Sequence, residues 1–249
     1  MFFFEGNILS PVIIREQHVK MPITVLAWDE DAFIDHENGI LHKEIINDFG
    51  PDDITLLFTL GLNKNKKEGV LVVERLNADK EVELCIGNVN FKTVFDAAHA
   101  EVKNGVQIKN VYIDADYRAM GIALTSYEII LRYFNVISDS HQTMDGASLW
   151  KFKLAKQEHI EVRVLSGFPE NITFMHDEDG ENEIYAIEKR HLESLIWGIE
   201  SGESIDRNHI TYGYGTGHDK VVLIARMQVI PNAIGGQALP EGEIFVLAP

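Results

Sequence analysis

Residues 111–123 read Val-Tyr-Ile-Asp-Ala-Asp-Tyr-Arg-Ala-Met-Gly-Ile-Ala, and the fold class follows from this segment outward. The apolar run that ends at Ile113 predicts a strand over 106–113. Apolar residues at helical spacing after Met120 predict a long helix over 120–134. A strand, a tight polar loop and a helix in this order indicate a mixed α/β sheet.

The loop between that strand and that helix carries the pattern Arg118-x-x-Gly121-x-Ala123. A glycine lets a phosphate approach the backbone, and the N–H groups and dipole of a helix start attract its charge. Arg118 would add a charge-assisted contact. The pattern therefore predicts an anion site, although a helix start whose glycine merely packs on the sheet gives the same letters. No lysine follows Gly121, which excludes a P-loop.

Other elements follow from the same periodicities on either side of this segment. Strands are expected at 22–28, 53–60, 70–76, 81–86, 135–138 and 159–165, and helices at 42–49, 91–102, 144–154 and 188–198. Polar residues at 63–69 and 77–80 predict turns between paired strands. Cys85 lies in a predicted strand and Trp150 in a predicted helix, and both are expected in the core.

The chain of 249 residues is strongly acidic, with 22 basic and 39 acidic side chains and a formal charge of −17. Nucleic-acid binding requires a surplus of Lys and Arg, so a general nucleic-acid binder is not expected. An acidic surface suits an amine substrate or a basic protein partner. The same charge can also serve solubility alone.

Residue content excludes further classes. Cys85 is the single cysteine, so an intrachain disulfide and a cysteine-rich zinc site are excluded. None of the ten histidines falls in a metal-ligand spacing, and no metal is expected. No apolar run reaches the roughly 20 residues of a membrane helix, and the first residues do not resemble a secretory signal. We expect a cytoplasmic protein without a membrane partner, and the sequence leaves a homo-oligomer open.

A second informative stretch, residues 146–154, reads Gly-Ala-Ser-Leu-Trp-Lys-Phe-Lys-Leu and follows the strand expected at 135–138. Together with Arg118, Gly121 and Ala123, it resembles the GNAT family of acyl-CoA-dependent N-acyltransferases, in particular a subgroup often found in bacteriophage genomes. That family carries Arg/Gln-x-x-Gly-x-Gly/Ala between its fourth strand and third helix. A helix reading Ala-x-x-Leu-Tyr-x-Lys-x-Gly-Phe often follows its fifth strand.

The resemblance, which covers about residues 55–165, implies an α/β fold with a GNAT-like, mixed and mostly antiparallel central sheet and flanking helices. The remaining residues at the end of the chain are expected to form a C-terminal α+β extension. The resemblance divides the chain into an N-terminal segment of the core at 1–54, an acyl-CoA-binding core at 55–165 and an extension of unknown role at 166–249. It implies an N-acetyltransferase that moves an acetyl group from acetyl-CoA to an amine on a basic protein or small molecule. If a phage encodes the chain, the compartment is the host cytoplasm.

The resemblance also implies where the coenzyme lies. The acyl-pantetheine arm would run between two splayed strands, one ending at Ile113 and the other beginning near Asn135, and the pyrophosphate would lie at the helix start. The residues implied to hold the coenzyme are Tyr112, Ile113, Arg118, Ala119, Met120, Gly121, Ile122 and Ala123.

Two positions depart from the family pattern. Trp150 replaces the tyrosine that usually serves as the acid, and an indole N–H is not a useful acid. No carboxylate stands in the strand at 106–113, where family members can carry the base. The candidate catalytic residues are Asp114, Asp139 and His141. Each could instead be structural, as a loop cap, a turn residue and a surface side chain. The alternative function is therefore a weak or inactive GNAT-fold phage factor that binds a host or virion partner through its acidic surface.

Overall fold

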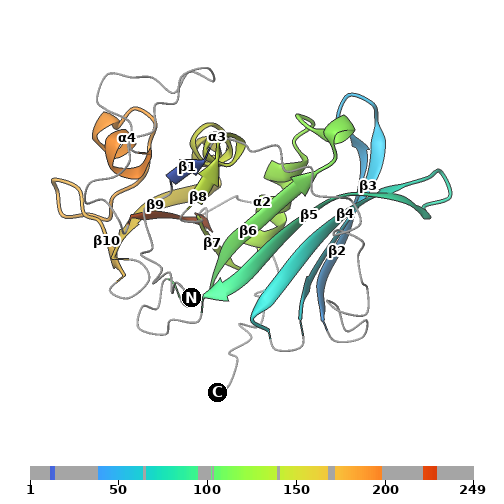
Figure 1. Cartoon of the computed structure of the whole chain (residues 1–249), viewed down its shortest axis with the longest axis horizontal. Coiled ribbons are helices and arrows are strands. Elements are labelled where there is room, and N and C mark those ends of the chain that lie inside the picture. The colour runs from blue at the N-terminus through green and yellow to red at the C-terminus, as the bar shows by residue number, and fades with distance from the viewer. Residues whose placement is uncertain are drawn as a thin grey trace, which may run out of the picture.

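The structure is a computed structural model, and it describes residues 12–14, 39–63, 66–94, 102, 104–138, 141–167, 172–197 and 221–228. Within these ranges a nine-stranded, mostly antiparallel sheet dominates and helices are few (Figure 1). The fold class is therefore α/β. None of the helices in these ranges is long and apolar enough to cross a membrane.

The large sheet crosses the molecule in the strand order β10-β9-β11-β7-β6-β5-β4-β3-β2 (Figure 1). Its strands are β2 Ile40–Phe49, β3 Ile54–Leu62, β4 Glu68–Leu76, β5 Val82–Val94, β6 Gly105–Ile113, β7 Asn135–Ile137, β9 Ile160–Ser166, β10 Thr173–Phe174 and β11 Val222–Met227. A small second sheet pairs β1 (Val12–Ile14) with β8 (His141–Thr143) in parallel.

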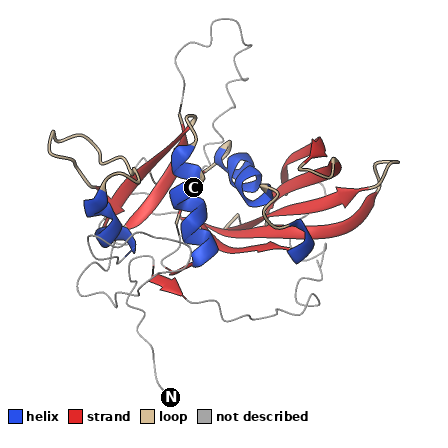
Figure 2. Cartoon of the chain, turned by 90° about the horizontal axis from the view of Figure 1, so that it is seen from above, coloured by secondary structure: helices blue, strands red, loops and turns tan. Residues whose placement is uncertain are grey.

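The helices are short, and they lie beside the sheet without forming a continuous layer (Figure 2). They are α2 Ile122–Leu131, α3 Met144–Phe152 and α4 Arg190–Trp197, with the 3-10 turns η2 Ala115–Tyr117 and η3 Leu154–Lys156. The rings of Tyr127 on α2 and Trp150 on α3 meet edge-on with centroids 6.2 Å apart. These two helices therefore pack side by side.

The connections explain the strand order. Strands β2 to β6 form an antiparallel meander, which short turns can join. Strands β6 and β7 run parallel and are joined by α2, as a parallel pair requires a crossover. Strand β11 lies between β7 and β9 and is antiparallel to both. The central sheet thus includes a strand from residues 222–227, far along the chain.

Buried residues lie on both faces of this sheet, because neighbouring side chains in a strand point to opposite faces. The larger cluster joins Phe58 of β3 to side chains of α2, α3 and α4, among them Trp150 and Ile196. The smaller cluster consists of Val102, Ile137, Leu165, Ile172, Val222 and Ile224. The three helices therefore cover one face of the sheet.

Most predicted elements are confirmed, but the helix predicted at 42–49 is wrong. The first four residues of the helix predicted at 91–102 form a strand, and residues 95–101 lie outside the described residues. Residues 42–49 form part of β2, because alternate side chains such as Ile46 pack on the core while the strand pairs with β3. Residues 91–94 continue β5, where they pair with β6 as far as Gly105. Cys85 is exposed instead of buried. The strand expected at 22–28 lies outside the described residues.

Candidate functional site

Strands β6 and β7 are paired over a short length only. Three residue pairs join them, from Gly105 with Asn135 to Gln107 with Ile137. Strand β7 ends at Ile137, whereas β6 continues to Ile113. We call the unpaired part of β6, residues 108–113, together with the end of β7 at Ile137 and Ser138 the fork.

Buried polar groups fix the vertex of the fork. Gln107 Nε2 donates to the backbone oxygen of Ser138, 3.3 Å away. Ser138 is fully buried, and its Oγ accepts the backbone N–H of Leu223 on β11 at 3.0 Å. The Ser138 N–H in turn donates to the Leu223 oxygen at 2.9 Å. These bonds direct the chain after β7 toward β11.

A bulge bends β6 just beyond the vertex. Asn110 lies opposite Asn90 of β5, but Ile108 lies opposite Phe91, so Lys109 is an extra residue in β6. A β-bulge locally bends its strand and increases the twist. The bulge thus lies at the start of the segment along which β6 and β7 are no longer paired.

Asp114 ends β6 and caps the turn that follows. Its side chain accepts the backbone N–H of Asp116 at 3.1 Å as the N-cap of η2, and its own N–H donates to the Ile86 oxygen at 2.8 Å. These bonds support the alternative in which Asp114 is a loop cap and not a catalytic base. The carboxylate is half-buried, and its second oxygen has no hydrogen bond within the described residues.

The start of α2 has an unusual backbone. Ala119 and Gly121 both have positive φ, 63° and 95°, a conformation that favours glycine. Gly121 is the N-cap, and no side chain caps the helix. A Cβ built on Gly121 would meet no heavy atom within 4 Å. The start of α2 thus has open space on the side of the Gly121 Cα, and its first N–H groups have no side-chain cap, which is compatible with the predicted anion site.

Arg118 lies next to this helix start and reaches back to the end of β6. Its Nε donates to the backbone oxygen of Ile113 at 3.1 Å, and the residue is exposed. Arg118 has no ion pair among the described residues. Nearby, Arg75 of β4 donates to the hydroxyl of Tyr117 at 3.0 Å and ties the loop to the sheet. A cation is therefore held beside the fork and the helix start.

Three other residues of the predicted coenzyme site have side chains that pack on the core. Met120 packs on the core and on the turn at Gly50, where an added Cβ would lie 2.6 Å from the Met120 methyl group. The side chain of Ile122 is buried and that of Ile113 packs on the same core. Tyr112, next to Ile113 in the strand, points to the opposite face.

Trp150 lies in the core, as predicted. Its side chain is fully buried, and its Nε1 has no hydrogen-bond partner within the described part of the chain. The adjacent Lys151 is also buried and forms an ion pair with Glu193 of α4. The helix that carries the second motif is therefore fixed by α4.

The described residues do not place the other two candidate bases, His141 and Asp139, in the fork. His141 begins β8, where its backbone pairs with Val12. Asp139 lies outside the described residues. Among the described residues, no group of three or more His, Cys, Asp or Glu side chains could hold a metal ion.

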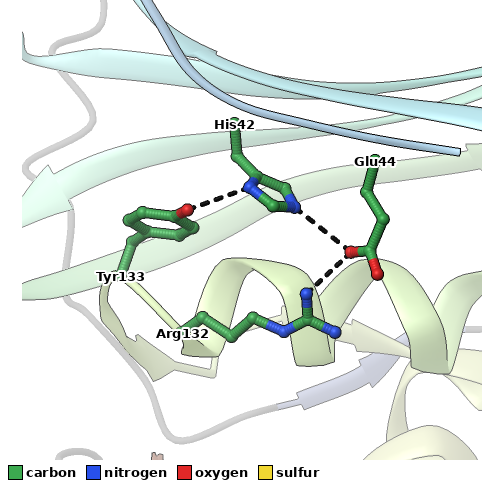
Figure 3. A network of polar contacts seen from close by, with 4 residues as sticks. All are labelled: His42, Glu44, Arg132 and Tyr133. Atoms are coloured by element: carbon green, nitrogen blue, oxygen red, sulfur yellow. Dashed lines mark hydrogen bonds and ion pairs between the residues drawn. The ribbon is translucent and has the colours of Figure 1, made fainter. Parts of the chain in front are cut away.

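One polar network was missed by the sequence analysis. His42, Glu44, Arg132 and Tyr133 are linked by hydrogen bonds between β2 and the end of α2 (Figure 3). Residues i and i+2 share a face in a strand and not in a helix. Had residues 42–49 been interpreted as a strand, the His-x-Glu spacing would have placed two of these side chains together.

No family model matches the chain, and neither a curated protein nor a solved structure matches it. The functional assignment therefore depends on the residues of the fork and of the helix start.

Proposed function

We propose that the chain is a GNAT-like N-acetyltransferase that binds acetyl-CoA in the fork and acetylates an amine. One observation carries the proposal: β6 continues beyond its pairing with β7 and leads to a helix start that has no side-chain cap and has open space beside Gly121. The motif residues Arg118, Gly121 and Ala123 lie at that helix start. Sequence motif and geometry thus support the same site.

The proposed coenzyme is an anion, and the site offers it local positive charge. Uncapped N–H groups at a helix start carry partial positive charge, and Arg118 adds a full one. Residues Tyr112 and Ile113 would offer backbone groups to the pantetheine arm. A chain with a net charge of −17 can therefore bind an anion at this place.

Acetyl-CoA, when bound, would supply a thioester whose acyl carbon an amine nitrogen can attack. The residues of the fork would act by holding the amine against that carbon, which replaces a bimolecular encounter by a positioned one. Asp114 has a second carboxylate oxygen at the end of β6 that can accept the amine proton. Trp150 is fully buried and its indole does not release a proton at neutral pH, so it would not protonate the departing thiol.

The acceptor class follows from charge. An acidic protein attracts cations and raises their local concentration. We therefore propose a polyamine or a lysine-rich protein segment as the acceptor.

A second function is favoured by two of the same observations. Asp114 is already engaged as a cap, and Trp150 stands where a proton donor is expected. A weak or inactive protein of this fold, acting as a phage factor that binds a basic partner, would fit both facts.

Mass spectrometry of a reaction mixture distinguishes the two functions. The full chain is incubated with acetyl-CoA and either spermidine or a lysine-rich peptide, and acetylated product is measured against a reaction without protein. Acetylated amine supports the enzyme. Acetyl-CoA binding without product supports the second function, and absence of both binding and product contradicts the proposed coenzyme site.

A further inference from the structure

A chain of polar side chains joins β2 to the residues at the end of α2 (Figure 3). The Tyr133 hydroxyl lies 3.0 Å from His42 Nδ1, and His42 Nε2 lies 3.1 Å from Glu44 Oε2. Arg132 Nη1 donates to the same Glu44 oxygen at 2.7 Å. A phenol, an imidazole and a carboxylate are thus connected in series.

The charge on Glu44 settles which nitrogen of His42 carries its hydrogen. Burial by itself would raise the pKa of Glu44, but its hydrogen bonds and charge interactions with His42 and Arg132 outweigh burial and lower it. The ionised carboxylate can only accept, so in neutral His42 the Nε2 carries the hydrogen and donates. The Nδ1 then has a free lone pair, and the Tyr133 hydroxyl donates to it.

We propose that Tyr133 is a nucleophile, activated by His42 and Glu44, that takes an acyl group from an activated ester. A nucleophile within hydrogen-bond reach of a base, which is itself oriented by a third group, is the arrangement that covalent catalysis uses. Tyr133 is 42% exposed, so an ester in solution can reach it.

The proposed step conserves atoms and charge. The Tyr133 oxygen forms a bond to the acyl carbon while its proton moves to His42 Nδ1. The bond between the acyl carbon and the leaving oxygen breaks, and that oxygen takes the proton from Nδ1. Glu44 stays ionised throughout and stabilises the transient imidazolium. Water can then hydrolyse the Tyr133 ester, with His42 again accepting a proton.

The proposal is tested by acetylating the full chain with p-nitrophenyl acetate and mapping the product by peptide mass spectrometry. Tyr117 is the internal reference, because its hydroxyl is bonded to Arg75, which cannot accept a proton. A general base accelerates proton removal by about 100-fold or more, so Tyr133 should be acetylated at least about tenfold faster than Tyr117.

Two variants distinguish activation of Tyr133 by His42 from a purely structural role of the network in joining β2 to α2. His42→Gln should lower the Tyr133 rate to that of Tyr117. Glu128→Gln removes another histidine-bonded carboxylate of the same helix, 3.2 Å from His159, and should leave the rate unchanged. Circular dichroism verifies that both variants are folded. Equal rates at Tyr133 and Tyr117 in the unmodified chain, or a fast Tyr133 in folded His42→Gln protein, would overturn the proposal.

Discussion

Gln107 holds Ser138 at the vertex of the fork through a hydrogen bond of 3.3 Å from Nε2 to the backbone oxygen. The other end of the same amide is also used, since Lys109 Nζ donates to Gln107 Oε1 at 2.7 Å. Gln107 is only 8% exposed. One buried side chain therefore links the last paired residues of β6 and β7 to the bulge in β6.

Replacing Gln107 by leucine should destabilise the protein by about 1–3 kcal/mol, because a buried carbonyl then loses its donor. Urea unfolding measures this change. Gln157→Leu is the matched control, since Gln157 donates to the Lys153 oxygen at the same distance of 3.3 Å but at the surface. The control should change stability by less than about 0.5 kcal/mol. Equal losses in the two variants would contradict the assigned role of Gln107.

A second buried network fixes the helix that carries Trp150. Lys151 forms an ion pair with Glu193, whose other oxygen accepts the Tyr185 hydroxyl at 3.0 Å. The Tyr185 oxygen in turn accepts Trp197 Nε1 at 3.0 Å. Burial, followed by the charge of Glu193, raises the pKa of Tyr185 well above its usual value. The phenol therefore remains a donor to Glu193 throughout the usual pH range.

Lys151→Met should cost about 3–5 kcal/mol, because Glu193 keeps a buried charge without its cation. Adding Glu193→Met should restore part of that loss, since no buried charge remains. Urea unfolding of the single and double variants measures both. Glu83→Gln, which breaks the exposed pair with Arg75, should cost less than about 1 kcal/mol. A double variant less stable than Lys151→Met would contradict this account.

The lowered pKa of Glu44 predicts a dependence of stability on pH. A carboxyl whose pKa falls on folding stabilises the folded state above its unfolded pKa, near the ordinary glutamate value of 4.5. This contribution is lost as the pH falls through the lowered value. The difference in Tm between the unmodified chain and Glu44→Gln should therefore be constant from neutral pH to about 4.5 and shrink below it. A Tm difference that grows as the pH falls would show that folding raises the pKa of Glu44 and would contradict this account.

The sequence predicted the part of the fold whose signals are local. Residues 106–113 and 144–154 have periods that match their elements, and both are confirmed as β6 and α3. The helix predicted at 42–49 was wrong, because its side chains alternate: Ile45 is exposed whereas the adjacent Ile46 packs on the core. Pairing with β3, which no local pattern reports, determines that strand.

In the candidate site, too, features with a local sequence signal were predicted, whereas features that depend on distant residues were not. The positions of Arg118 and Gly121 at a helix start followed from their motif. The vertex at Gln107 and Ser138 depends on Leu223, which is distant in sequence, and so could not be inferred. The same holds for Tyr133, which meets His42 across 91 positions.

The central claim is that acetyl-CoA binds at the start of α2, and calorimetric titration of Gly121→Glu tests it most directly. The new carboxylate would occupy the open space beside the helix start and repel a pyrophosphate. Gly180→Glu is the matched control, because Gly180 also has positive φ, 82°, and open space around an added Cβ. We expect the unmodified chain and Gly180→Glu to bind acetyl-CoA and Gly121→Glu to lose binding. No binding by the unmodified chain, or equal binding by all three, would contradict the account.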